Sequence, residues 1–312
     1  MTRTPLKARL YERETHFRES LDEAELVCGP AFDEVIRRTA LLMIKPEGVL
    51  SGKLDAICDF LAENDFAIVS TNFVTFHRLL WRELWRYQLT SATLDRLLVA
   101  DRHLSAGPGL LLVLRSSPGH ELPATVRLTS RKGSASLAQQ TPGTLRHRLG
   151  QANRVLSLLH VADEPADLIR ELGILFDRPE RRRVYRTMCT GRPGSADLAA
   201  LAEARTTEPR SLGASEALER VTAAVRERRD VDPVVAQAVL ADLARMRAGE
   251  RIEWRPFEEG LTALDVAADD WDLIVLGTSF IVYDEPGASK VLVNPDPAEW
   301  LQPSLDELLI SG

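Results

Sequence analysis

Residues 39–44 read Thr-Ala-Leu-Leu-Met-Ile, and Lys45 and Pro46 end this apolar run. A short, continuous apolar run that stops at a proline is typical of a central β-strand that is covered on both faces. Two glycines follow, and an amphipathic helix is expected from about residue 53 to residue 63. This stretch therefore predicts a strand and a helix of an α/β domain.

Further apolar segments continue this alternation up to residue 176. The expected strands are residues 39–44, 65–77, 109–114 and 155–161, and the expected helices are residues 53–63, two stretches on either side of 90–91, 121–132 and 164–176. Asp163 is expected to cap the last helix, and residues 133–148 are expected to form a loop. The order of elements predicts an α/β (α+β) fold, a ferredoxin-like sandwich with an antiparallel sheet.

Extensions flank this predicted domain on both sides. Residues 1–37 have the pattern of an amphipathic helical extension, and a Gly, Pro and Ser-rich linker lies near residues 191–195. In the C-terminal region we expect helices at about residues 195–205, 215–229 and 233–248, followed by a small β-hairpin formed by residues 271–283 and 290–294. The expected parts are a helical N-terminal extension (1–37), a central domain (38–180) and a mostly helical C-terminal domain of unknown role (181–312).

The composition argues against several classes of protein. The 312 residues are 45% hydrophobic and 27% charged, with a net charge of −7, so a soluble globular protein is expected and a nucleic-acid binder is not. No signal peptide or window long enough to cross a bilayer is apparent, so we expect a cytoplasmic protein without membrane contact. The 3 cysteines and 6 histidines are scattered, which favours reduced thiols and argues against a protein-ligated metal.

Four short segments and one glutamate carry the candidate chemistry. The segments are 40–49 (ALLMIKPEGV), 105–108 (SAGP), 142–146 (PGTLR) and 158–163 (LLHVAD), and Glu171 follows in the sequence RELGILF. These pieces occur in the order found in nucleoside diphosphate kinases, so residues 38–180 resemble that family. The resemblance implies that family's ferredoxin-like fold.

The resemblance also implies a phosphotransferase, a kinase that works by double displacement. His160 would attack the γ-phosphoryl group of ATP or another nucleoside triphosphate, hold it as phosphohistidine and pass it to a nucleoside diphosphate. Lys45 and Arg146 would neutralise the phosphate oxygens, and Glu171 would orient the histidine ring. Mg²⁺ would be bound mainly through the phosphates and needs no protein cage.

The nucleotide-binding residues depart in part from the family. Tyr87 resembles the family's phosphate-side tyrosine, and either Arg127 or Arg131 would supply a second arginine. Ser157 stands where the family has a sugar-binding asparagine, and residues 92–102 contain no aromatic residue that could stack on a base. Because base stacking stabilises binding, we expect weak binding of ordinary nucleotides with little preference among bases.

Three functions fit these residues. The first is transfer to a nucleoside diphosphate, and the second keeps the histidine chemistry but delivers the phosphoryl group to another small molecule or to a protein. The third is a non-catalytic, nucleotide-binding regulatory or scaffolding module. Because members of the family usually assemble into oligomers, the resemblance also implies a homo-oligomer.

Overall fold

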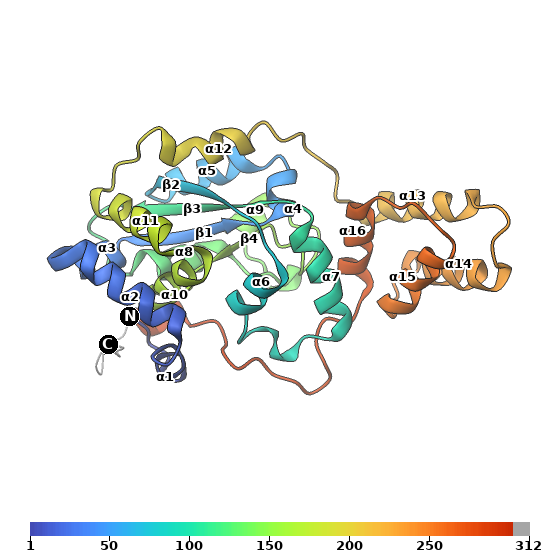
Figure 1. Cartoon of the computed structure of the whole chain (residues 1–312), viewed down its shortest axis with the longest axis horizontal. Helices are drawn as coiled ribbons and strands as arrows, with labels where there is room; N and C mark the ends of the chain where they lie inside the picture. Colours follow the sequence, from blue (N-terminus) through green and yellow to red (C-terminus); the bar gives the residue numbers. More distant parts are fainter. Residues whose placement is uncertain (302–312) are drawn as a thin grey trace.

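A four-stranded antiparallel sheet forms the centre of the computed structural model, which describes residues 1–301 (Figure 1). Its strands are β1 (Thr39–Ile44), β2 (Phe66–Val74), β3 (Gly109–Ser116) and β4 (Leu159–Val161). They lie in the order β2-β3-β1-β4, and every neighbouring pair is antiparallel. The predicted ferredoxin-like sandwich is therefore confirmed.

The side chains of β1 alternate between two hydrophobic cores, one on each face of the sheet. Leu41 and Met43 belong to the first core, whereas Ala40, Leu42 and Ile44 belong to the second. Successive residues of a strand point to opposite faces, so a strand that is covered on both sides has to be apolar at every position. The apolar run of residues 39–44 thus places β1 between two layers of helices.

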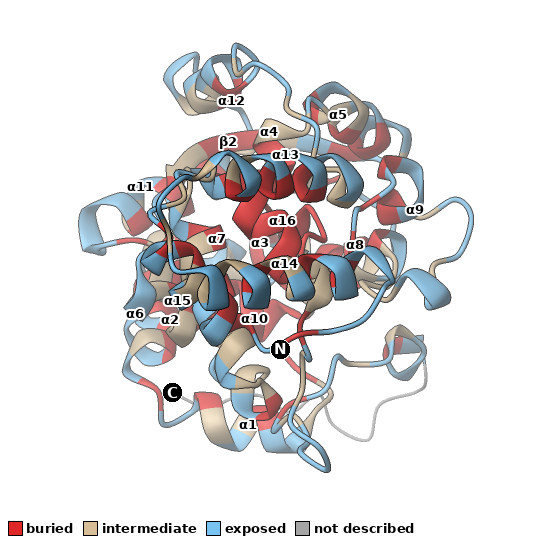
Figure 2. Ribbon diagram, turned by 90° about the vertical axis from the view of Figure 1, so that its right-hand side faces the viewer, coloured by how far each residue is buried: buried red, intermediate tan, exposed pale blue. Residues whose placement is uncertain are grey.

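Helices cover both faces of the sheet, and their buried sides are visible in Figure 2. Side chains of the first core come from α1 (Pro5–Tyr11), α2 (Thr15–Cys28), α3 (Phe32–Arg37), α6 (Arg78–Leu84), α7 (Leu94–Ser105), α10 (Pro165–Leu175) and α11 (Arg178–Thr190). Side chains of the second core come from α4 (Pro46–Leu50), α5 (Leu54–Glu63), α8 (Ala124–Lys132), α9 (Leu145–Leu149) and α12 (Ala199–Ala204). The two cores thus include helices α11 and α12, which follow residue 177.

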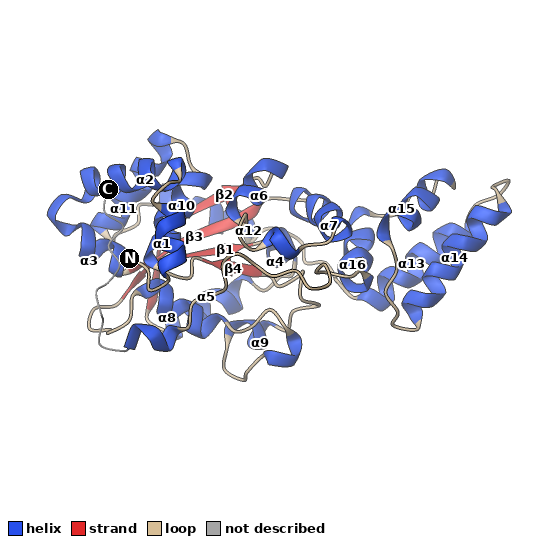
Figure 3. Ribbon diagram, turned by 90° about the horizontal axis from the view of Figure 1, so that it is seen from below, coloured by secondary structure: helices blue, strands red, loops and turns tan. Residues whose placement is uncertain are grey.

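The remaining helices form a third hydrophobic core that projects from the sheet domain (Figure 3). They are α13 (Ala214–Glu227), α14 (Pro233–Arg247), α15 (Trp254–Ala263) and α16 (Asp270–Phe280). Val99 of α7 and Leu156 are buried in the same core. The C-terminal helices therefore pack directly on the central domain, on the side of α7.

The expected β-hairpin in residues 271–283 and 290–294 is wrong. Residues 271–280 lie in helix α16, whose N-cap Asp269 accepts hydrogen bonds from the backbone amides of Trp271 and Asp272. Helix α16 contacts α7 and α13, so it has little polar surface and its apolar run resembles that of a buried strand. The following residues contribute one isolated bridge, between Ala92 and Asp284.

The strand expected at residues 155–161 is shorter in the structure, where it begins at Leu159. The side-chain oxygen of Asn153 accepts hydrogen bonds from the amides of Val155 and Leu156, and Leu158 has a positive φ of 66°. These features hold residues 153–158 in a turn. The expected loop at residues 133–148 likewise contains the start of the short helix α9.

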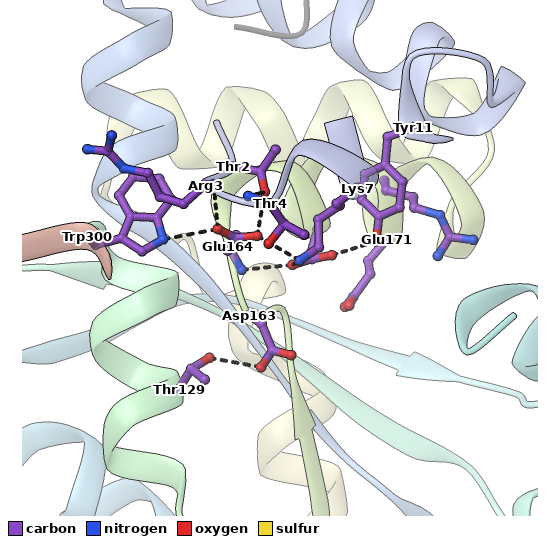
Figure 4. Close-up of polar contacts among 12 residues, drawn as sticks. Thr2, Arg3, Thr4, Lys7, Tyr11, Thr129, Asp163, Glu164, Glu171 and Trp300 are labelled. Atoms are coloured by element: carbon purple, nitrogen blue, oxygen red, sulfur yellow. Dashed lines mark hydrogen bonds and ion pairs between the residues drawn. The ribbon is translucent and has the colours of Figure 1, made fainter. Parts of the chain in front are cut away.

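The two ends of the described chain meet at Glu164, the N-cap of α10 (Figure 4). Its carboxylate accepts hydrogen bonds from Thr2 Oγ1 at 2.6 Å, Lys7 Nζ at 2.8 Å and Trp300 Nε1 at 3.0 Å. The cap expected at Asp163 is thus supplied by the next residue. These contacts fix the start of the helix that carries Glu171.

Candidate functional site

A cavity of about 220 Å³ lies beside the C-terminal end of β1 and the N-terminal end of β4. It brings together four residues that the sequence singled out, Lys45, Arg146, Ser157 and His160. The other lining residues come from α6, α7, the loops near residues 88, 135 and 154, and two C-terminal positions, Tyr283 and Lys290. One cavity therefore combines four of the predicted residues with distant parts of the chain.

His160 lies on β4 with both ring nitrogens hydrogen-bonded. Its Nε2 lies 2.8 Å from Oε1 of Glu171 on α10, and its Nδ1 lies 3.3 Å from Nε1 of Trp85. A carboxylate only accepts hydrogen bonds and an indole N–H only donates them. Both partners therefore favour the tautomer with the proton on Nε2 and a lone pair on Nδ1. This is the tautomer that a nucleophilic nitrogen needs.

Lys45 follows β1 and belongs to a buried polar triad with Glu47 and His103. Its Nζ lies 2.8 Å from Oε1 of Glu47 and donates a hydrogen bond to the carbonyl of Val155, while His103 Nε2 lies 2.7 Å from Oε2 of Glu47. Burial by itself would raise the pKa of Glu47, but Lys45 and His103 outweigh this effect and lower the pKa to about 2. The triad fixes the lysine at the wall of the cavity.

Arg146 lies on α9 and donates hydrogen bonds to three backbone carbonyls. Its acceptors are Ser157 at 3.3 Å, Gly133 at 2.9 Å and Leu159 at 2.7 Å. Burial lowers the pKa of Arg146 to about 10, so the guanidinium remains charged at neutral pH. Arg146 therefore contributes a positive charge to the wall of the cavity and holds the turn that precedes β4.

Three predicted nucleotide-binding residues do not line this cavity. Tyr87 donates its hydroxyl hydrogen to the buried carboxylate of Glu14 in the N-terminal extension. Arg127 lies over the ring of Phe66, 4.0 Å from its centroid, and bonds to the carbonyl of Asn64, while Arg131 is exposed on α8. Tyr87 and Arg127 are thus held by other parts of the structure, and Arg131 is exposed to solvent.

The sequence analysis did not name most of the lining residues, among them Trp85, Arg96, Arg154, Tyr283 and Lys290. Trp85 lies two positions before Tyr87, and this closeness to a predicted nucleotide-binding residue was the signal in the sequence that could have identified it. Tyr283 and Lys290 belong to residues 281–292, here called the crossing segment, which runs from α16 across the sheet domain (Figure 1). A contact between positions so far apart in the chain leaves no local pattern in the sequence.

The lining of the cavity contains no carboxylate within the described residues. Residues 1–301 also contain no group of three or more His, Cys, Asp or Glu side chains arranged to hold a metal ion. A Mg²⁺ ion in this cavity would have to be held by the phosphate oxygens of a ligand, because the lining offers no carboxylate. Over the same residues, every helix is too short or too polar to cross a membrane.

The fold and the site define a domain with a histidine in a cation-lined cavity. Residues 38–181 match the family model described as nucleoside diphosphate kinase, so the resemblance is confirmed for this part of the chain. The chain is 27% identical over 140 residues to a nucleoside diphosphate kinase of Natronomonas pharaonis, a match that covers 45% of this chain and 86% of that protein. A second relative is a thioredoxin domain-containing protein 3 homolog of Heliocidaris crassispina, 26% identical over 150 residues; the match covers 47% of this chain but only 17% of the relative's length.

Solved structures with similarity to this chain include two kinases. An NDP kinase from Pyrobaculum aerophilum is 18% identical with a TM-score of 0.38, and the match covers 46% of this chain and 97% of that chain. A halophilic nucleoside diphosphate kinase from Halobacterium salinarum, solved in complex with CDP, is 23% identical with a TM-score of 0.38, and the match covers 46% of this chain and 89% of that chain.

Proposed function

We propose that the protein is a phosphotransferase that moves the γ-phosphoryl group of a nucleoside triphosphate through a phosphohistidine on His160. The observation that carries this proposal is the pair of hydrogen bonds at His160, because Glu171 and Trp85 favour the same tautomer. That tautomer puts the nucleophilic lone pair on Nδ1, where it accepts the Trp85 hydrogen bond, within a cavity lined by Lys45 and Arg146.

In the proposed first step, Nδ1 of His160 forms a bond to the γ-phosphorus. The bond between that phosphorus and the bridging oxygen breaks, and the electron pair leaves with the nucleoside diphosphate. Glu171 keeps the proton on Nε2 and stabilises the positive charge that develops on the ring. Lys45 and Arg146 stabilise the negative charge that the phosphoryl oxygens carry during transfer. The reverse step returns the phosphoryl group to an acceptor.

Nucleoside diphosphate is the proposed default acceptor, and Mg²⁺ accompanies the phosphates when a nucleotide binds. The charged part of the site, which includes Lys45, Arg146, His160 and Glu171, supports transfer over a purely scaffolding function. A homo-oligomer remains an expectation from the family resemblance.

A second candidate is transfer to a different small molecule or to a protein. The observation that favours it is the crossing segment, which is hydrogen-bonded to residues 90–93, where the stretch without a base-stacking aromatic begins. The backbone amide of Thr93 donates to the carbonyl of Tyr283 at 3.2 Å, and that of Glu285 donates to the carbonyl of Ser91 at 2.7 Å. The chain itself therefore contacts the beginning of this stretch.

Single-turnover discharge of the phosphorylated enzyme separates the two candidates. The phosphoenzyme is isolated and mixed with ADP, GDP, CDP or UDP, and the loss of the phosphoryl group is followed over time. We expect transfer to each diphosphate only when that diphosphate is at high concentration, and we expect similar rates for the four bases. Rapid discharge at low micromolar concentration by one diphosphate would show that another residue holds the base. Complete inertness toward all four would rule out nucleoside diphosphate as the acceptor.

A further inference from the structure

The crossing segment holds Lys290 in a fixed position beside the cavity. On one side, Thr90 Oγ1 donates to the carbonyl of Ser289 at 3.1 Å; on the other, the amide of Val291 donates to the carbonyl of Tyr87 at 3.0 Å. Both neighbours of Lys290 are thus hydrogen-bonded to the loop between α6 and α7. A side chain on a backbone held at both sides loses less conformational entropy when it binds a ligand.

Other cations of the cavity already have partners in the protein. Lys45 pairs with Glu47, and Asp284 pairs with both Arg96 at 2.6 Å and Arg154 at 3.1 Å. By contrast, the ammonium group of Lys290 forms no hydrogen bond and no ion pair with residues 1–301, although it lines the same cavity as His160. Lys290 therefore contributes a positive charge, and no carboxylate of the described residues lies within 4 Å of it.

The electrostatic surroundings of Lys290 also favour an anionic ligand. Burial and the positive charges of Arg154 and Arg96 lower the pKa of Lys290, and Asp284 and Asp163 offset this effect only in part. A phosphate group that entered the cavity would relieve this repulsion between cations. The second arginine expected on α8 is not at the cavity: Arg127 is bonded elsewhere and Arg131 does not line it.

We infer that Lys290 supplies a third phosphate-binding cation of this site beside Lys45 and Arg146, and that the cavity recognises the polyphosphate part of its ligand through a residue of the C-terminal region. The inference rests on the proposed function in that it takes the cavity as the phosphate site. Because Lys290 belongs to the crossing segment, the inference makes this segment a part of the phosphate site. The C-terminal region thereby acquires a function that the family domain at residues 38–181 does not include.

Binding of inorganic tripolyphosphate to the full-length protein, measured by titration calorimetry at low salt, tests this inference. Lys290→Met is expected to weaken binding about 10-fold or more, as for loss of a charged hydrogen bond, whereas Lys290→Arg is expected to remain within about 3-fold of wild type. Arg247→Met is the matched control, because Arg247 is exposed on α14 and its loss is expected to leave binding unchanged. Circular dichroism confirms that each variant is folded.

Two results would overturn the inference: wild-type protein that does not bind tripolyphosphate, or folded Lys290→Met that binds it as tightly as wild type. The test also separates this inference from the proposed catalysis. His160→Ala is expected to keep binding that depends on Lys290. If ATP fails to phosphorylate wild type while Lys290 still controls tripolyphosphate binding, the phosphotransferase proposal fails and this inference holds.

Discussion

Nε1 of Trp85 donates a hydrogen bond to Nδ1 of His160 at 3.3 Å, and the two rings meet edge to face with centroids 5.5 Å apart. Trp85 also stacks on Phe76 at 6.0 Å, so its ring is held by packing in addition to the hydrogen bond. The lone pair that the proposed reaction uses is therefore occupied by a protein donor before substrate arrives. Removal of the Trp85 N–H is therefore expected to free the Nδ1 lone pair.

Trp85→Phe is predicted to speed the formation of phosphohistidine about 2- to 10-fold. The substitution removes the N–H donor but keeps an aromatic ring against Phe76, and one hydrogen bond contributes about 0.5–1.5 kcal/mol. Rapid-quench measurement of the first turnover with ATP gives the rate. Slower phosphorylation of the folded variant would mean that Trp85 positions the histidine ring and does not restrain its lone pair.

Arg146→Lys is predicted to slow phosphoryl transfer on the order of 10²-fold, because an ammonium group cannot reproduce the planar guanidinium that contacts three carbonyls. The matched control is Arg148→Lys on the same helix, where the side chain is exposed and pairs with Glu63. The control is expected to transfer at the wild-type rate. Equal rates for both folded variants would exclude Arg146 from the transfer step.

Glu47→Gln is predicted to lower the free energy of unfolding by about 3 kcal/mol at neutral pH. This value follows from the pKa of the Glu47 carboxyl group, which folding lowers from 4.5 to about 2. A lowered carboxyl pKa stabilises the folded state above pH 4.5, and this stabilisation is lost as the pH falls toward 2. Urea unfolding of both proteins at several pH values should therefore show a difference that shrinks between pH 4.5 and 2. Glu285→Gln, at an exposed position, serves as the control, and a Glu47→Gln difference that stays constant with pH would contradict the account.

Cys28 and Cys189 are predicted to form a disulfide when the protein is treated with a thiol oxidant such as diamide. Their sulfur atoms lie 2.8 Å apart at the ends of α2 and α11, although the residues are 161 positions apart in the chain. Burial, and then the hydrogen bond with Cys189, raise the pKa of the Cys28 thiol, so slow formation is expected.

Non-reducing peptide mapping detects this disulfide. Cys28→Ser should abolish it, whereas Cys58→Ser is expected to leave it unchanged. A link that involves Cys58, or three thiols that stay reduced while the folded protein is exposed to excess oxidant, would contradict the prediction.

The sheet domain was predictable from sequence because its signals are local. A strand that is buried on both faces, such as residues 39–44, needs an unbroken apolar run, and the helices between strands have an amphipathic period. Helix α16 was not predictable in this way, because α7 and α13 contact it and its apolar run fits a strand equally well. Local patterns thus identified the amphipathic helices and the buried strand β1, and failed for α16 because a buried helix and a buried strand share an unbroken apolar run.

The candidate site was predictable where its residues lie in or next to the short segments that resemble nucleoside diphosphate kinases. Lys45 follows β1 and His160 lies in β4, and the structure brings both into one cavity with Arg146 and Ser157. Lys290 reaches the cavity through hydrogen bonds between the crossing segment and the loop before α7, which no local pattern encodes. Tyr87 lies outside the lining because Glu14 of the N-terminal extension accepts its hydroxyl hydrogen.

Intact-mass measurement after mixing with ATP and Mg²⁺ tests the central claim most directly. Wild-type protein is predicted to gain one phosphoryl group, which is lost in acid and survives base as expected for a phosphoramidate, and His160→Ala is predicted to gain none. A wild-type protein of unchanged mass, an acid-stable adduct, or an adduct that persists in His160→Ala would contradict the assignment of His160 as the phosphoryl carrier.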